Sequence, residues 1–272
     1  MLPATGAPEP VVDAVVALVR ASGPYDIVSL AVPGGPVWDR ARPGQLLVLP
    51  GAATRGEVLP RVLWLAGVRV EPVHGTTAEV VLPVGHGLVV GAGVRLLGPL
   101  GRGFPLPAGP TPTLLIGHEG SVVPLRWLVA LLRERDCPVH TVLSADDPDH
   151  HLDLGLLRRQ ATSVVLTDPQ ELPAVVAARL DDPDLEVALV VATGPLTLVR
   201  EVAALALARG LTTRVAAVDP GAPVVCGTGL CGQCDLVVGN GDGGGTTAAA
   251  RTVRACLDGP VAPGEWVLGA PR

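Results

Sequence analysis

The sequence predicts three parts in series: a β barrel, an α/β domain with a parallel sheet, and a short C-terminal segment rich in cysteine. Three observations support this order. Short Val- and Leu-rich runs cut by Gly or Pro fill the first third, strand-length and helix-length patterns then alternate, and four of the five cysteines lie in the last fifth. We place the domain boundaries at 1–107, 108–218 and 219–272.

Residues from about 12 to 107 have the rhythm of a small all-β unit. Turn residues interrupt apolar runs every 8–12 residues or so, which is typical of a barrel or a sandwich. We favour the barrel. The runs that we expect to form strands are 26–32, 44–50, 61–70, 78–84 and 87–99.

The pattern changes after a turn-rich linker at 108–112. Strands are predicted at 113–120, 138–145, 163–168 and 186–195, and helices at 122–136, 170–182 and 196–210. Strands that alternate with helices indicate a parallel sheet covered by helices.

Cysteines dominate the last part of the chain. Cys226, Cys231 and Cys234 have the spacing C-x4-C-x2-C, and Cys256 follows after a Gly-rich insert at 239–249. This spacing is the plant-type [2Fe–2S] ligand pattern, in which four thiolates hold a cluster that transfers one electron at a time. The sequence therefore predicts redox chemistry at these four residues.

Glycines between the first three ligands support an iron–sulfur loop. Gly227, Gly229 and Gly232 allow a positive φ and a close approach of the backbone to the sulfurs. A four-cysteine zinc site is the alternative, although such sites are usually built from C-x2-C pairs. Disulfides or unliganded thiols are a third reading.

Composition excludes several other classes of function. The net charge is −6, aromatic residues make up 2%, and all 20 basic residues are Arg, so we expect no nucleic-acid binding. No apolar run reaches the roughly 18 residues of a membrane helix, and no secretion signal is recognisable, so we expect a cytoplasmic protein without a membrane anchor.

Several short motifs resemble those of one known family. Arg42–Gln45 (RPGQ), Gly98–Phe104 (GPLGRGF), Thr193–Pro195 (TGP) and Cys256–Val261 (CLDGPV) follow one another in the family's order. With the cysteine loop, they make the chain similar to the electron-transfer subunit of class 1B dihydroorotate dehydrogenase, in the ferredoxin reductase superfamily. The resemblance covers nearly the full length.

The resemblance implies a function and a partner. Such a subunit docks on a catalytic flavoprotein, here of the dihydroorotate dehydrogenase type, in a heterotetramer that serves pyrimidine biosynthesis. The barrel would carry FAD, the α/β domain would bind NAD, and the [2Fe–2S] cluster would relay electrons. The chain would then be a non-catalytic electron-transfer subunit of an oxidoreductase.

The flavin motif differs from the family pattern at two places. Arg61 matches the residue that would bind a flavin phosphate, but Trp64 replaces the small hydroxyl residue expected near the flavin ring. Gly87 matches the second flavin segment, where the expected Thr and short helix are missing. FAD binding through Arg61 and Gly87 is therefore expected to be weakened.

The nicotinamide motif is changed as well. The family's glycine-rich turn is replaced by residues 117–124, in which His118 and Glu119 stand where glycines would let a pyrophosphate approach. Thr193 replaces a cysteine near the nicotinamide. We expect no NAD binding, which argues against a stand-alone NAD(P)H reductase and leaves open a non-enzymatic accessory or redox-sensing subunit.

Other reactive side chains have simpler explanations. His118 and Glu119 could form an acid–base pair, but a solvated turn is the simpler interpretation. Metal-capable residues gather at 146–153, where we expect a surface loop. Cys137 follows a predicted helix and is interpreted as a buried bystander thiol.

Overall fold

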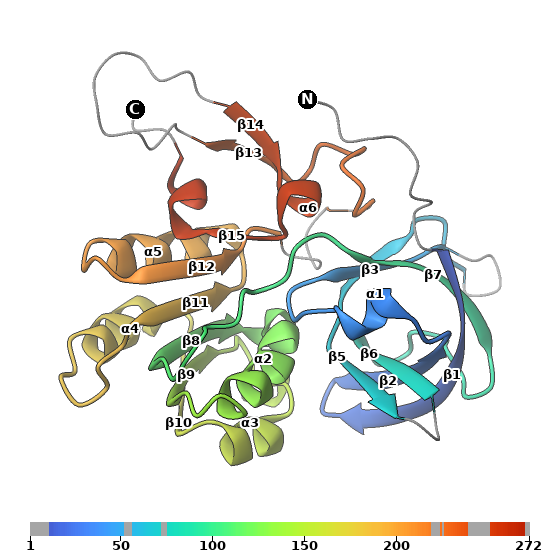
Figure 1. The fold of residues 1–272 in the computed structure, drawn as a ribbon, viewed down its shortest axis with the longest axis horizontal. Helices are drawn as coiled ribbons and strands as arrows, with labels where there is room; N and C mark the ends of the chain where they lie inside the picture. Colours follow the sequence, from blue (N-terminus) through green and yellow to red (C-terminus); the bar gives the residue numbers. More distant parts are fainter. Residues whose placement is uncertain are drawn as a thin grey trace.

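The computed structural model describes residues 11–51, 56–71, 75–218, 224, 226–238 and 251–269. It contains an antiparallel sheet, an α/β sheet and a small C-terminal hairpin, which stands above β15 and α6 in the view of Figure 1. The Gly-rich insert at 239–249 lies outside the described residues.

The N-terminal part is a seven-stranded antiparallel sheet with the order β4-β3-β7-β1-β2-β6-β5. Its strands are β1 (Val11–Ser22), β2 (Tyr25–Val32), β3 (Leu46–Leu49), β4 (Arg61–Trp64), β5 (Gly67–Glu71), β6 (Gly75–Pro83) and β7 (Gly93–Leu100). A short helix, α1 (Pro36–Asp39), precedes β3.

This sheet differs from the predicted barrel in one respect. Among the residues that the structure describes, no strand pairing joins the edge strands β4 and β5 and closes the sheet. The predicted strand at 61–70 is instead divided between these two edges. Leu65 and Ala66 connect them. The Leu65 N–H donates to the carbonyl of Gln45, just before β3, at 2.9 Å, and the Ala66 N–H donates to the carbonyl of Glu79 in β6 at 2.8 Å.

The second sheet is parallel except at one edge. Its order is β10-β9-β8-β11-β12-β15, and β15 runs antiparallel to β12. The strands are β8 (Thr113–His118), β9 (Val139–Ser144), β10 (Ser163–Thr167), β11 (Leu189–Thr193), β12 (Thr212–Ala216) and β15 (Val261–Pro263). The predicted α/β alternation is confirmed.

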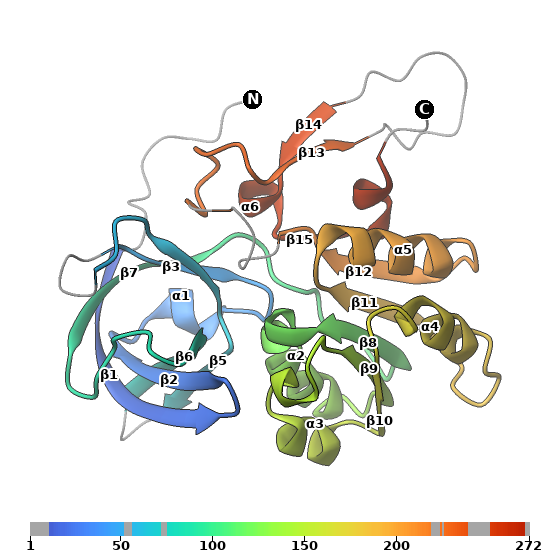
Figure 2. The ribbon, with the colours of Figure 1, turned by 180° about the vertical axis from the view of Figure 1, so that it is seen from behind.

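Four helices cover the parallel sheet: α2 (Val123–Arg133), α3 (Leu154–Gln160), α4 (Leu172–Leu180) and α5 (Leu196–Leu207). Right-handed crossovers place α2 and α3 on one face and α4 and α5 on the other (Figure 2). From β8 the chain adds strands toward one edge of the sheet (β9, β10), and from β11 it adds them toward the other (β12), so the strand order reverses between β8 and β11. Crevices at such a reversal are where open α/β sheets bind ligands.

The C-terminal segment joins the two sheets. It holds β13 (Asp235–Val238) paired with β14 (Arg251–Arg254), then α6 (Ala255–Asp258) and β15. Arg102, just after the antiparallel sheet, donates its N–H to the Gly259 carbonyl, while Ala217 donates to the Pro260 carbonyl at 2.8 Å. The chain that follows Cys256 is therefore fixed to both sheets.

Two of the motifs that carry the family resemblance meet beside this junction. The Gln45 side chain donates to the Gly101 carbonyl at 2.9 Å, and the Phe104 N–H donates to the Pro43 carbonyl at 2.7 Å. Gly103 lies so close that an added Cβ would be 2.5 Å from the Pro43 oxygen. The RPGQ and GPLGRGF segments thus form one packed corner.

The described part of the chain contains no helix that is both long and apolar enough to span a bilayer.

Candidate functional site

The cysteine loop is shaped by its glycines. Gly227, Gly229 and Gly232 all have positive φ values, of 64°, 76° and 69°. A Cβ on Gly227 would lie 2.8 Å from Val48 of β3, and one on Gly229 would lie 2.5 Å from Leu257 of α6. The loop is therefore wedged between the antiparallel sheet and the helix that carries Cys256.

The four thiols form two pairs. The Sγ atoms of Cys226 and Cys231 are 3.4 Å apart, and those of Cys234 and Cys256 are 3.0 Å apart. No three of these sulfurs, all of which the structure describes, lie within 4.8 Å of one another. A tetrahedral zinc site would bring all four to about 3.8 Å from one another. Two separate pairs suit two metal centres better than one.

Backbone donors gather at one sulfur. The N–H groups of Thr228, Leu230 and Cys231 point at Cys226 Sγ, with N···S distances of 3.4, 3.3 and 3.4 Å. Burial alone would raise the pKa of Cys226, but the donors at Thr228 and Cys231 outweigh it and lower the pKa to about 6. The loop therefore favours a thiolate at Cys226, which is the form that ligates metal.

Cys256 has the opposite environment. It is fully buried in α6 beside Cys234, whose carbonyl accepts the Ala255 N–H at 3.0 Å. Burial, and then the Cys234 thiol, raise the pKa of Cys256 to about 12. The thiol is therefore favoured over the thiolate at this position, and a bound cation would reverse that preference.

The residues predicted to bind FAD are occupied by partners within the chain. Arg61 forms an ion pair with Glu57, four residues earlier in the sequence. Gly87 has the positive φ expected of its segment, 77°, but no helix follows it. The neighbouring Leu88 N–H donates to His86 Nδ1 at 3.0 Å and is not free to bind phosphate.

His86 is a structural residue that the sequence analysis did not identify. Its imidazole is buried, and its Nε2 lies 3.2 Å from an Asp26 carboxylate oxygen of β2. The Gly-His-Gly context gave no signal that this side chain turns inward.

A cavity of about 410 Å³ lies between the antiparallel sheet and the C-terminal edge of the parallel sheet. Trp64 lines it with an exposed fraction of 5%, and its indole N–H has no hydrogen-bond partner among the described residues. Tyr25 lines the cavity too, and burial followed by the charge of Glu119 raises its pKa. The bulky, donor-only indole is thus placed where the resemblance implies a flavin ring.

The turn that replaces the nucleotide-binding glycines starts at the end of β8. His118 ends the strand, and Glu119 begins a 3₁₀ helix (Glu119–Val122) with a φ of 42°. A left-handed non-glycine residue costs roughly 1–3 kcal/mol and persists only where its surroundings hold it. Thr193, at the end of β11, is fully buried and donates to the Ile116 carbonyl at 3.4 Å.

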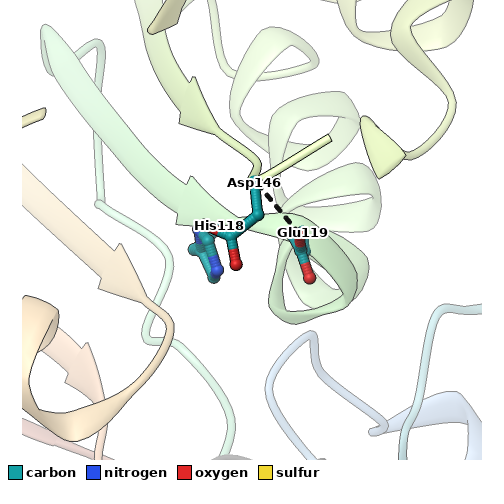
Figure 3. Close-up of side chains that lie close together, drawn as sticks. All are labelled: His118, Glu119 and Asp146. Atoms are coloured by element: carbon teal, nitrogen blue, oxygen red, sulfur yellow. Dashed lines mark hydrogen bonds between the residues drawn. The ribbon is translucent and has the colours of Figure 1, made fainter. Parts of the chain in front are cut away.

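The structure brings together two segments that the sequence analysis treated separately. His118 and Glu119 lie beside Asp146, which follows β9, and one ligand atom from each lies within 4.8 Å of the others (Figure 3). The Asp146 N–H donates to Glu119 Oε1 at 3.0 Å. Adjacent parallel strands end at one edge of a sheet, so the order of β8 and β9 could have revealed this grouping.

Cys137 lies apart from the other cysteines. Its thiol is buried, accepts the Thr111 N–H at 3.4 Å and lies near the Gly109 carbonyl. These contacts agree with its interpretation as a bystander.

Comparison with known proteins identifies the type of fold. No family model matches the chain. Among solved structures it is similar to an NADH-dependent reduced ferredoxin-NADP oxidoreductase, with a TM-score of 0.70, 20% identity, and 93% of this chain and 88% of the other covered. It is also similar to the ferredoxin reductase in carbazole 1,9a-dioxygenase, with a TM-score of 0.56, 20% identity, and 74% and 66% covered. The fold is ferredoxin reductase-like.

Two curated relatives narrow the resemblance. Both are named dihydroorotate dehydrogenase B (NAD(+)), electron transfer subunit. The protein of Desulforamulus reducens is 25% identical, with 84% of this chain and 87% of the relative covered. That of Shouchella clausii is 27% identical, with 89% and 93% covered. The predicted resemblance of this chain to the electron-transfer subunits of dihydroorotate dehydrogenase B is thereby confirmed.

Proposed function

We propose that this chain is an electron-transfer subunit that relays single electrons through a [2Fe–2S] cluster held by Cys226, Cys231, Cys234 and Cys256. The observation that carries the proposal is the arrangement of the four thiols in two pairs, at 3.4 and 3.0 Å. Each pair can hold one iron, and the cluster supplies reversible one-electron transfer.

The chain's own residues hold the ligands in place. Three backbone N–H groups stabilise negative charge at Cys226, and the anchored strand β15 fixes the segment that begins at Cys256. The surface beside the proposed ligands is open to solvent. Leu230, next to Cys231, is 86% exposed, and Leu257, next to Cys256, is 50% exposed. A partner can therefore approach the cysteine loop closely.

The partner in this proposal is a catalytic flavoprotein of the dihydroorotate dehydrogenase type. The names of the two curated relatives support it, as both denote the electron-transfer subunit of that enzyme. The assembly would be a cytoplasmic heterotetramer that contributes to pyrimidine biosynthesis.

In this proposal the relay works without FAD and without NAD. The Arg61–Glu57 ion pair, the contact between Leu88 and His86, and the buried Trp64 all oppose flavin binding. Glu119 adds negative charge where a pyrophosphate would lie. The electrons would then pass from the partner's flavin to an external acceptor.

The test compares two cysteine variants of the chain co-purified with its catalytic partner under anaerobic conditions. Cys231→Ser should remove the EPR signal of the reduced cluster and abolish dihydroorotate-dependent reduction of cytochrome c. Cys137→Ser, the matched control, should keep both. Unchanged reduction of cytochrome c by the Cys231→Ser complex would contradict the relay.

A second candidate is an accessory subunit that stabilises the flavoprotein while its cluster has a structural or redox-sensing role. The Arg61–Glu57 ion pair and the hydrogen bond from Leu88 to His86 favour it, because they oppose binding of the FAD that would otherwise accept the electrons. The two functions are distinguished by the range of acceptors. If the accessory role is correct, adding the chain raises the thermal stability of the partner and leaves its acceptor range unchanged.

A further inference from the structure

A group of metal-capable side chains lies at the carboxyl edge of the parallel sheet, away from the cysteines. His118 comes from the end of β8, Glu119 from the next position, and Asp146 from the segment after β9 (Figure 3). One ligand atom from each residue lies within 4.8 Å of the others. One imidazole and two carboxylates form a donor set that suits first-row divalent cations.

The imidazole is oriented by the sheet. His118 pairs in register with Ser144 of β9, and its Nδ1 lies 3.1 Å from the buried Ser144 Oγ. With the proton on Nδ1, the ring donates to that oxygen and Nε2 keeps its lone pair. Metal-binding histidines are commonly fixed by such a hydrogen bond from the second ring nitrogen.

The glutamate is held from two sides. Glu119 Oε1 accepts the Asp146 N–H at 3.0 Å and lies 3.3 Å from His150 Nδ1. Both of these contacts are to Oε1, and neither involves the second carboxylate oxygen, Oε2. The strained backbone at Glu119, with a φ of 42°, is thus fixed in an orientation that keeps one oxygen next to His118 and Asp146.

The two carboxylates of this group concentrate negative charge at the edge of the sheet. In the part of the chain that the structure describes, neither Glu119 nor Asp146 forms an ion pair with an Arg. The neighbouring His151 does not supply a positive charge, because its pKa is lowered, first by burial, although Glu119 acts in the opposite direction. A divalent cation would offset this concentration of negative charge.

Space for further ligands lies on both sides of the group. His118 and Glu119 line the 410 Å³ cavity between the two sheets, and His118 and Asp146 line a second cavity of about 230 Å³. The buried indole N–H of Trp64, in the wall of the larger cavity, has no partner among the described residues. A water molecule or small anion carried by a cation would bring an acceptor into that cavity.

We propose that His118, Glu119 and Asp146 bind a divalent first-row cation at the site where related folds would hold a dinucleotide. The proposal goes beyond electron relay and does not depend on the cysteines. Under this proposal, the turn after β8 is a cation-binding site and not merely a phosphate site that has lost its glycines.

The test uses Mn²⁺ and the intact chain with its cysteine site loaded. Mn²⁺ prefers oxygen and nitrogen ligands and competes poorly for thiolates, so it reports on this group. Free Mn²⁺ is followed by EPR during a titration of the wild type, Asp146→Asn, His118→Gln and Asp149→Asn. Asp149 is the matched control, because it is an exposed acid of the same segment that lies outside the three-residue group.

The wild type and Asp149→Asn should bind one Mn²⁺ per chain with similar affinity. Asp146→Asn and His118→Gln should each weaken binding by about 10-fold or more. Nitrogen modulation from a bound imidazole should appear in pulsed EPR of the wild type and vanish in His118→Gln. The proposal is wrong if the wild type shows no saturable binding, if Asp149→Asn weakens binding as much as Asp146→Asn, or if the modulation survives in His118→Gln.

Discussion

At the scale of single residues, the four cysteines differ sharply in environment although they serve one proposed cluster. Cys226 lies among three backbone N–H donors, which stabilise its thiolate. Cys256 is fully buried next to another thiol. In the proposed cluster, the loop would hold one ligand as a thiolate before the metal binds, whereas the buried ligand would become charged only on binding the metal.

This difference predicts selective alkylation of the metal-free chain. With its pKa lowered to about 6, Cys226 is mostly thiolate at pH 7 and should react with iodoacetamide faster than the other four cysteines. Because the thiolate is lost as the pH falls through this pKa, labelling at pH 5 should be slower by about 10-fold. Peptide mass spectrometry after short pulses measures this order. Faster labelling of Cys231 or Cys234 at pH 7 would contradict it.

At the scale of elements, the glycines of the cysteine loop are not equivalent. Gly229 and Gly232 both have positive φ, at 76° and 69°, so Ala carries a similar backbone cost of roughly 1 kcal/mol at either place. At Gly229 the new Cβ would also be too close to a side chain, 2.5 Å from Leu257 Cδ1, whereas at Gly232 the nearest atom, Asp235 Oδ2, is 3.8 Å away in ordinary van der Waals contact. The side chain of Leu257, next to Cys256, must therefore shift in one variant and not in the other.

We expect Gly229→Ala to lose more than half of the iron–sulfur absorption per chain and Gly232→Ala to keep most of it. Overpacking of this kind costs about 1–3 kcal/mol, which adds to the backbone strain shared by both variants. Iron and sulfide content of anaerobically purified protein measures the effect. Equal cluster content in the two variants would show that α6 does not depend on this contact.

Particular elements also show how far the sequence could go. The alternation of strands and helices after residue 113 is sufficient to predict the α/β sheet, because this signal is local. The C-x4-C-x2-C spacing is local too, and the [2Fe–2S] ligands that it indicates stay a prediction. The run at 61–70 was predicted as one strand, but it serves two edges of the sheet, which depends on distant partners in β3 and β6. The inward turn of His86 and the approach of Asp146 to His118 depend equally on contacts between remote segments.

At the scale of the whole molecule, Trp64 stands at the cavity where both sheets and the turn at His118 meet. Replacing it with Ser should restore the small hydroxyl residue implied by the resemblance and enlarge the cavity. Loss of a buried Trp costs about 3–5 kcal/mol, so the thermal midpoint should fall. If the indole is what excludes a flavin ring, FAD binding measured by fluorescence quenching should be tighter in Trp64→Ser than in the wild type. Wild-type protein that retains FAD through purification would contradict this account.

The segment that follows Cys256 packs against the antiparallel sheet at Gly101. This residue has a φ of 75°, and a Cβ there would lie 2.4 Å from both the Gly259 oxygen and Pro260 Cδ, in the segment just after Cys256. Gly91, with a φ of 86° and nothing within 4 Å of an added Cβ, is its matched control. Both Ala variants share the backbone strain, but only Gly101→Ala pushes the C-terminal segment off the antiparallel sheet.

We expect Gly101→Ala to lower the free energy of unfolding by about 1–3 kcal/mol more than Gly91→Ala, and to lose cluster content with it. Urea denaturation followed by circular dichroism, with iron analysis of the same samples, measures both quantities. Equal destabilisation of the two variants would mean that the segment after Cys256 is held by β15 and the parallel sheet alone.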